Sequence, residues 1–262
     1  MSPPVSYAVA DAVATITLDR PEAMNSLDTV TKMALRDHVL RAAGDTTVRA
    51  VVLTGTGRAF CVGQDLKEHA ATLDAGAADL GQTVREHYNP IATTLATMPK
   101  PVIAAVNGIA AGAGAAFAFA CDLRVVADTA GFNLAFAAIG LSCDSGSSWT
   151  LPRLVGWARA RELLLLPRTV TADEALALGL ATEVVPADAV LDRATDLARQ
   201  LAAGPTRAYA AIKEALAYSA THDLAAAVTT EGELMQRTGG TSDHRAAVAA
   251  FLAKQTPAFD GT

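Results

Sequence analysis

Two glycine-bearing segments of this 262-residue chain could place backbone N–H groups around a developing negative charge. The first, GRAFCVGQDL, covers residues 57–66, and the second, VNGIAAGAGAAFAFACD, covers residues 106–122. Each follows an apolar run typical of a buried strand, so each can present main-chain donors at the end of a sheet, where ligands of α/β folds bind. Gly112 opens an apolar helix, whose unpaired N–H groups favour an anion. A tight turn with close packing would also explain either segment by itself.

Other catalytic signatures are incomplete in this sequence. Gly112 and Gly114 begin a G-x-G-x-x-G pattern, but Phe117 stands at its last position, so the dinucleotide-binding fingerprint is broken. No glycine-rich loop carries a Walker A lysine. Asp144 stands where the nucleophile elbow G-x-S-x-G requires its final glycine. The histidines show no spacing typical of metal ligands, so we expect no metal site.

The elements that must position these segments are predicted from the apolar pattern. Strands are expected at residues 13–18, 49–54, 102–106 and 123–127, and helices at residues 27–43 and 112–120. Because strands and helices alternate, we expect an α/β core with parallel strands. Residues 60–80 contain two glycines and many polar groups, which predicts an irregular surface segment.

The second half of the chain is predicted to be helical. A capping box at residues 171–174 opens a short helix that Gly179 ends. Alanine-rich helices follow from Pro205 onward, and their amphipathic faces suit contacts between subunits. We therefore expect a core with the ligand site over residues 1–195 and a C-terminal helical region for oligomer contacts over residues 196–262.

Composition and charge restrict the class of partner. The formal net charge is −6 at pH 7 and the basic residues form no stripe, which argues against nucleic acid. Residues 101–120 are apolar over the length of a membrane helix, but Asn107 and Gly108 interrupt them like a turn, so a buried strand and a buried helix fit better. The cysteines lie too far apart in sequence to suggest a disulfide framework, and no secretory signal is visible. A cytoplasmic location is therefore expected.

Four separated motifs together resemble the crotonase family of acyl-CoA enzymes. They are LDRPEAMNSL at 18–27, GRAFCVGQDL at 57–66, KPVIAAVNGIAAGAG at 100–114 and CDLRVV at 121–126, and the likeness continues to AAFLAKQTPAFDG at 249–261. The resemblance implies an α/β spiral of β-β-α turns followed by C-terminal helices, assembled as trimers or hexamers. It also implies an acyl-CoA substrate and no cofactor, since coenzyme A is part of the thioester.

The resemblance assigns the family's oxyanion hole to the backbone N–H groups of Gln64 and Ala113. Two such donors stabilise a thioester enolate, and loss of one typically raises the barrier by roughly 3 kcal/mol. Because only main-chain atoms act, alanine can replace the glycine of many members if its φ is negative. The resemblance assigns further substrate contacts, several along coenzyme A, to Arg20, Ala23, Val62, Gly63, Asp65, Leu66, Lys67 and Gly112.

The choice of reaction depends on where carboxylates stand. Hydratases of this family use two glutamates to activate and deliver water, and the resemblance places those positions at Ala116 and Phe136, which are apolar here. Asp144 stands where certain isomerases and a dehalogenase of the family keep a catalytic aspartate. It could alternatively be the N-cap of the following helix. Apolar neighbours would raise its pKa by desolvation and make it a better base.

We therefore expect an acyl-CoA isomerase that shifts a double bond, or opens a ring epoxide, with Asp144 as the acid/base. Within the family, the likeness is greatest to the epoxyphenylacetyl-CoA isomerases of phenylacetate catabolism, although Ser142-Cys143 replaces an apolar residue and a proline, and Ser147 replaces a glycine. Residues 68–90 are expected to shape the acyl pocket, with the roles of His87 and Tyr88 left open.

Three alternatives remain open at this point. An enoyl-CoA hydratase in which Asp144 alone handles water is the principal one. A dehalogenase is disfavoured because Phe136 replaces an expected tryptophan. A non-catalytic relative that serves as a scaffold or binds RNA is the third, and the negative charge argues against the RNA-binding form.

Overall fold

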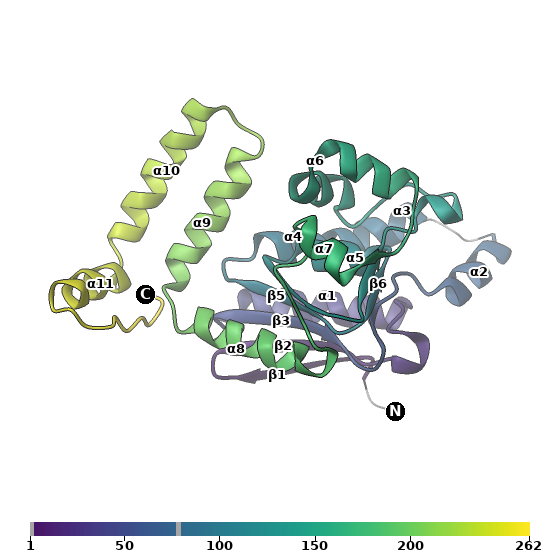
Figure 1. The fold of residues 1–262 in the computed structure, drawn as a ribbon, viewed down its shortest axis with the longest axis horizontal. Coiled ribbons are helices and arrows are strands. Elements are labelled where there is room, and N and C mark those ends of the chain that lie inside the picture. The colour runs from purple at the N-terminus through teal and green to yellow at the C-terminus, as the bar shows by residue number, and fades with distance from the viewer. Residues whose placement is uncertain (1–2, 77–79) are drawn as a thin grey trace.

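A six-stranded sheet forms the base of the structure, a computed structural model that describes residues 3–76 and 80–262 (Figure 1). In spatial order its strands are β1 (Val5–Ala10), β2 (Val13–Leu18), β3 (Ala50–Gly55), β5 (Val102–Val106), β7 (Leu123–Ala127) and β10 (Glu183–Val185). The hairpin of β1 and β2 is antiparallel, and the other neighbours are parallel. The predicted α/β core with parallel strands is therefore confirmed.

A second, smaller sheet lies beside the first. Its order is β4 (Ala59–Cys61), β6 (Ile109–Ala111), β8 (Gly131–Asn133) and β9 (Val170–Thr171). The chain passes from β3 to β4, from β5 to β6 and from β7 to β8, so each turn of chain adds one strand to each sheet. This repeat is the expected spiral of β-β-α turns.

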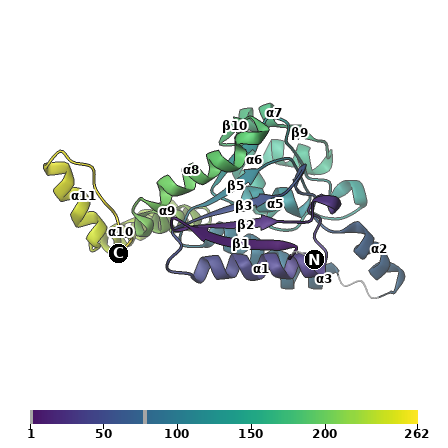
Figure 2. The ribbon, with the colours of Figure 1, turned by 90° about the horizontal axis from the view of Figure 1, so that it is seen from below.

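The remaining elements are helical. Along the chain they are η1 (Pro21–Ala23), α1 (Thr29–Gly44), α2 (Leu66–Asp74), α3 (Leu80–Thr83), the π-helical turn η2 (Val84–Tyr88), α4 (Asn89–Thr97), α5 (Ala113–Ala120), η3 (Ala137–Ile139), α6 (Ser147–Leu165), α7 (Ala172–Ala177), η4 (Ala187–Ala189), α8 (Val190–Ala202), α9 (Thr206–Ser219), α10 (Leu224–Gly239) and α11 (Ser242–Leu252). Helices α1 and α8 cover opposite faces of the large sheet (Figure 2).

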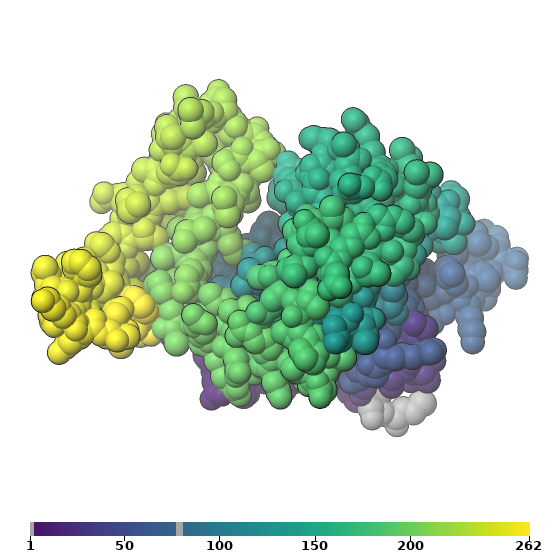
Figure 3. All heavy atoms as spheres, viewed as in Figure 1, coloured from purple at the N-terminus to yellow at the C-terminus, as the bar shows by residue number. Residues whose placement is uncertain are grey.

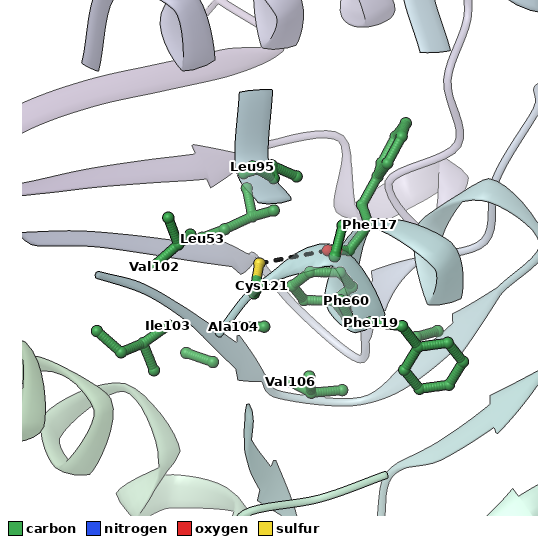
Figure 4. Close-up of a cluster of buried hydrophobic side chains, with 14 of the residues drawn as sticks. Leu53, Phe60, Leu95, Val102, Ile103, Ala104, Val106, Phe117, Phe119 and Cys121 are labelled. Atoms are coloured by element: carbon green, nitrogen blue, oxygen red, sulfur yellow. Dashed lines mark hydrogen bonds between the residues drawn. The ribbon is translucent and has the colours of Figure 1, made fainter. Parts of the chain in front are cut away.

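Apolar burial explains why the central strands form. Strands β3 and β5 are buried along almost their whole length, as expected for parallel strands covered on both faces. Figure 4 shows Leu53 and Ile103 from these strands in one cluster with Leu95 of α4 and Phe117 of α5. The apolar stretch 101–120 therefore forms two strands and a short helix inside the core. No helix of the described part is long and apolar enough to cross a membrane.

The prediction of an irregular segment at residues 60–80 is wrong for its central part, because residues 66–74 form helix α2. Asp65 caps this helix by accepting hydrogen bonds from the amides of Lys67 and Glu68, at 3.0 and 3.3 Å. The sequence does carry helix signals here, since Asp65 and Glu68 have capping-box spacing and Leu66, Ala70 and Leu73 repeat at helical spacing. The glycines at 63 and 76 and the many polar groups favoured the irregular segment instead. Residues 77–79 of the segment lie outside the described residues.

Helices α9 to α11 form an arm that stands away from the core (Figures 1 and 3). The guanidinium of Arg49, the residue before β3, holds the base of this arm by donating to the carbonyl oxygens of Gly204 (2.6 Å) and Phe259 (3.0 Å). The predicted helices from Pro205 onward are confirmed. The boundary expected between residues 195 and 196 falls inside α8, which packs on the large sheet, and the two-part division stays a prediction.

Candidate active site

The two glycine-bearing segments meet at one edge of the small sheet. Each segment contains one strand of this sheet, β4 or β6, and the turns after these strands, at Gly63 and Gly112, lie at the same side because β4 and β6 are parallel neighbours. Gly63 has φ +82°, and a Cβ there would lie 3.0 Å from the carbonyl oxygen of Ala111 and 3.2 Å from the amide nitrogen of Ala113. Close approach and a left-handed backbone together explain the glycine. The backbone beside Gln64 therefore lies directly against the first turn of α5.

The amides of Gln64 and Ala113 have no partner within their own elements. Leu27 forms an isolated parallel bridge with Gln64. The amide of Leu27 donates to the carbonyl of Gly63 (2.8 Å), and the carbonyl of Leu27 accepts from the amide of Asp65 (3.2 Å). Because successive peptide groups of a strand point to alternate sides, the N–H of Gln64 points away from Leu27. Ala113 is the first residue of α5, where the N–H has no acceptor one turn earlier, and its φ is not positive. Alanine can therefore stand at position 113 without a strained left-handed backbone.

A cavity of about 410 Å³ lies beside Gln64, between α2, the π-helical turn and the loop before α6. It is lined by Gln64, Leu66, His69, Gly81, Thr83, Val84, Arg85, Tyr88, Ile139, Leu141, Ser142, Cys143 and Asp144. The lining is mostly apolar with a few polar groups, which is typical of a site for a small organic molecule. The cavity thus joins the first glycine segment to Asp144, although 80 positions separate Gln64 from Asp144 in the chain.

Asp144 presents a half-buried carboxyl group to this cavity. Burial raises its pKa, and a 2.8 Å hydrogen bond from the hydroxyl of Ser145 opposes that rise. The alternative role as an N-cap is wrong, because α6 begins after Gly146 and no side chain caps it. The amide of Ser147, at the start of α6, donates to the main-chain carbonyl of Asp144 (2.9 Å) and not to its side chain. The carboxylate of Asp144 is therefore not used in capping the helix, and Asp144 lines the cavity. A carboxyl group with a raised pKa in an apolar cavity can act as a general base.

Tyr88 is a wall residue whose role the sequence left open. Its side chain is 2% exposed, and its hydroxyl donates a hydrogen bond to Oε1 of Gln64. Its ring meets that of Phe117 edge-on, with centroids 5.9 Å apart. The sequence analysis expected residues 68–90 to shape the acyl pocket, and several of them line this cavity, but it did not predict α2 or the π-helical turn that contains Tyr88. His87 does not line the cavity as Tyr88 does; burial lowers its pKa and its Nδ1 has no hydrogen-bond partner in the described part of the chain.

Ala116 and Phe136 lie in the protein interior. Ala116 is fully buried within α5, and Phe136 is 7% exposed just before η3. Among the described residues that line the cavity, neither is present. Their contact with an acyl group therefore stays a prediction, while their apolar character at the expected glutamate positions is a fact of the sequence.

Arg20, predicted to lie near coenzyme A phosphates, is already paired with carboxylates. Its guanidinium forms ion pairs with Asp28 (3.1 Å) and Asp65 (3.2 Å). Burial alone would raise the pKa of Asp65, but hydrogen bonds from Ser26, two α2 amides and Arg20 together lower it. Arg20 and Asp65 thus hold α2 against the loop at Ser26, and a contact of either with substrate stays a prediction.

Of the other residues expected to contact substrate, Leu66 and Lys67 lie in the first turn of α2. Leu66 is 54% exposed and Lys67 is exposed in its first turn. Ala23 and Val62 are half-buried, in η1 and in the loop after β4. Gly112 has φ +51° and precedes α5. In residues 3–76 and 80–262, no group of three or more His, Cys, Asp or Glu side chains is arranged to hold a metal ion.

Comparison with known proteins agrees with this architecture. A family model described as enoyl-CoA hydratase/isomerase matches residues 8–262. The chain is 41% identical over 253 residues to 1,2-epoxyphenylacetyl-CoA isomerase of Escherichia coli (strain K12), covering 97% of each chain. It is 35% identical over 246 residues to the 2,3-dehydroadipyl-CoA hydratase of the same strain, covering 94% of each.

Solved structures extend the match to three dimensions. A crystal structure of an enoyl-CoA hydratase/isomerase family member from Mycobacterium abscessus superposes with a TM-score of 0.95 at 45% identity, covering 98% of this chain and 100% of the other. Family model, relatives and fold therefore agree over nearly the whole chain. The protein belongs to the enoyl-CoA hydratase/isomerase family, the crotonase family expected from its motifs, and is an enzyme of that family.

Proposed function

We propose that the protein is an acyl-CoA isomerase that moves a double bond through a thioester enolate, with Asp144 as its acid/base. The observation that carries the proposal is the cavity that Gln64 and Asp144 share. Asp144 is the one carboxylate among the described residues that line it. Apolar Ala116 and Phe136 stand where the resemblance to the family expects the hydratase glutamates. One carboxylate suits proton transfer between two carbons, whereas the family's hydratases use two.

The chemistry begins with proton removal. The Asp144 carboxylate takes a proton from the carbon next to the thioester carbonyl, and the C–H electron pair moves toward the carbonyl oxygen. The N–H groups of Gln64 and Ala113 stabilise the resulting enolate oxygen. Asp144 then returns the proton at the far end of the conjugated system, which relocates the double bond. The thioester itself activates the proton, so the proposal requires no metal or redox cofactor.

The size and polarity of the cavity limit which acyl groups the protein can bind. The cavity volume of about 410 Å³ and the apolar lining suit an aromatic ring or a short aliphatic chain. The Escherichia coli relative named for 1,2-epoxyphenylacetyl-CoA makes an aromatic acyl group, including a ring epoxide, part of the proposal. Coenzyme A would leave the cavity past Leu66 and Lys67, which are exposed at the start of α2. We also propose assembly as trimers or hexamers through the C-terminal arm.

A hydratase is the second candidate. A hydratase of 2,3-dehydroadipyl-CoA is 35% identical to the chain, and Ser142 provides a hydroxyl beside Asp144 in the cavity lining. In that reaction Asp144 would activate water for addition to a 2-enoyl-CoA. Addition of the water oxygen to C3 would give a thioester enolate that is then protonated at C2. Both candidates therefore place an enolate oxygen at the same N–H groups, but they differ in how the enolate forms, by proton removal or by water addition, and in the final product.

The test is turnover of three thioesters by the purified protein: a 3-enoyl-CoA, crotonyl-CoA and an epoxyphenylacetyl-CoA. We expect conversion of the 3-enoyl-CoA to the conjugated 2-enoyl isomer, followed by its ultraviolet absorbance. The Asp144→Asn variant should lose this activity by about 10²-fold or more while it still binds an acyl-CoA in calorimetry. Rapid loss of crotonyl-CoA absorbance with no isomerisation would overturn the isomerase and favour the hydratase.

A further inference from the structure

Tyr88 connects the two segments that supply the proposed oxyanion donors. Its hydroxyl donates to the side-chain oxygen of Gln64, whose backbone N–H is the first donor. Its ring packs edge-on against Phe117, at an interplanar angle of 73°. Phe117 belongs to α5, which begins at Ala113, the second donor. One buried side chain therefore contacts both segments, and it also lines the cavity that holds Asp144.

A local irregularity of the helix directs Tyr88 into the cavity. The residues from Val84 to Tyr88 form a π-helical turn, and the amide of Asn89 bonds to the carbonyl of Val84 five residues earlier. Pro90 has no N–H, so it cannot donate to the carbonyl of Glu86. That carbonyl instead accepts from Arg36 of α1, at 3.2 Å. π-Helical turns are rare and are concentrated at functional sites.

The surroundings keep the Tyr88 hydroxyl protonated. Burial raises its pKa, and the carboxylate of Asp144 raises it further, ahead of smaller effects of Cys61 and Glu68. A phenol whose pKa is raised in this way stays protonated, and so remains a hydrogen-bond donor, at neutral pH. Its direction is also constrained, because a tyrosine side chain has few rotatable bonds and this one is 2% exposed.

We propose that Tyr88 is a positioning residue of the oxyanion hole, holding Gln64 so that its N–H stays aligned with that of Ala113. The inference rests on the proposed enolate chemistry. Gly63, which precedes Gln64, has φ +82° and adds backbone freedom to this loop. Leu27 anchors the peptide between Gly63 and Gln64 from one side, and Tyr88 anchors the Gln64 side chain from the cavity side.

The test compares Tyr88→Phe with wild type in the exchange of the α-protons of phenylacetyl-CoA in D₂O, followed by NMR. This reaction needs the base and the oxyanion donors but neither isomerisation nor water addition. Tyr88→Phe keeps the ring against Phe117 and loses only the hydroxyl. We expect kcat to fall about 10-fold with KM nearly unchanged, a fraction of the 10²–10³-fold typical for loss of a whole donor. Tyr218→Phe, on the arm, is the matched control.

Two further measurements separate positioning from a general loss of structure. Bound cinnamoyl-CoA should absorb at longer wavelength than free cinnamoyl-CoA, because hydrogen bonds polarise its carbonyl, and Tyr88→Phe should reduce that shift. Gln64→Met removes the side-chain acceptor and keeps the backbone amide. If Tyr88 acts through Gln64, adding Tyr88→Phe to Gln64→Met should cause no further loss.

The outcomes are distinguishable. If wild type catalyses no exchange, the enolate chemistry itself fails. If wild type exchanges protons and Tyr88→Phe matches it in rate and spectral shift, the positioning role fails and the proposed function survives. Additive losses in Tyr88→Phe and Gln64→Met would also overturn the positioning role.

Discussion

At Asp144, burial and a hydrogen bond act in opposite directions on one carboxyl group. Burial raises its pKa, and the Ser145 hydroxyl lowers it by stabilising the ionised form. Ser145 has φ +53° and Gly146 has φ +78°, so two consecutive left-handed residues turn the chain sharply between Asp144 and α6. The geometry keeps the carboxylate out of the helix cap and in the cavity lining. The balance between burial and that hydrogen bond determines the pH range in which the base is available.

The pH profile tests this balance. Asp144 must be ionised to take a proton, so kcat/KM should fall on the acid side as pH drops through its raised pKa. Ser145→Ala removes the hydrogen bond that favours the ionised form, so the acid limb should move to higher pH. The control is Ser147→Ala, since the buried Ser147 hydroxyl has no hydrogen-bond partner in the described part of the chain. An acid limb that shifts equally in both variants would contradict the role given to Ser145.

At the scale of elements, the contact between β4 and α5 decides whether the two proposed donors meet. Gly114 lies in the first turn of α5 against β4. A Cβ at Gly114 would lie 2.1 Å from the carbonyl oxygen of Cys61. A distance so short leaves no room for any other residue, so the helix and strand can approach this closely only with glycine.

Gly114→Ala should therefore push α5 away from β4 and displace the amide of Ala113. We expect kcat/KM to fall at least about 10-fold, and unfolding in urea to reveal a loss of about 1–3 kcal/mol, as for other overpacked sites. Gly44→Ala is the control, because a Cβ there meets nothing within 4 Å at the end of α1. Wild-type activity in Gly114→Ala would show that the close approach does not position the donors.

At the scale of the whole molecule, the arm of α9 to α11 depends on a few contacts with the core. Large apolar side chains are exposed along it, including Leu216, Leu224, Met235 and Phe251. An exposed apolar surface of this kind commonly marks a contact between subunits. Arg49 links the core to the base of the arm through Gly204, Thr206 and Phe259.

Arg49→Met should loosen the arm and weaken any assembly that depends on it. Three hydrogen bonds from one charged group are lost, which should cost about 2 kcal/mol or more of stability. Sedimentation velocity should show a shift toward smaller species than in wild type. Arg199→Met is the matched control, since Arg199 forms two exposed ion pairs, which are typically worth about 0–1 kcal/mol. Equal behaviour of the two variants would mean that Arg49 does not hold the arm.

The sequence by itself determined the features that depend on local pattern. Continuous apolar runs predicted the central strands, because both faces of parallel strands are buried. The glycine motifs predicted where main-chain donors lie, since glycine marks close approach and left-handed backbone whatever the partner. Asp144 was identified from its place in a motif, and the structure adds that its carboxylate lines the cavity with Gln64. Its catalytic role remains a prediction.

Only the tertiary structure decided how distant residues meet. Helix α2 was missed because Gly63, Gly76 and its polar residues favoured an irregular segment, although Asp65 and Glu68 have capping-box spacing; the contact of its cap with Arg20 exists only in the folded chain. The pairing of Arg20 with Asp65, across 45 positions, was equally invisible. Tyr88 reaches Gln64 only because a π-helical turn rotates it into the cavity. Sequence patterns report which residues are buried, whereas the identity of their neighbours follows from the path of the chain.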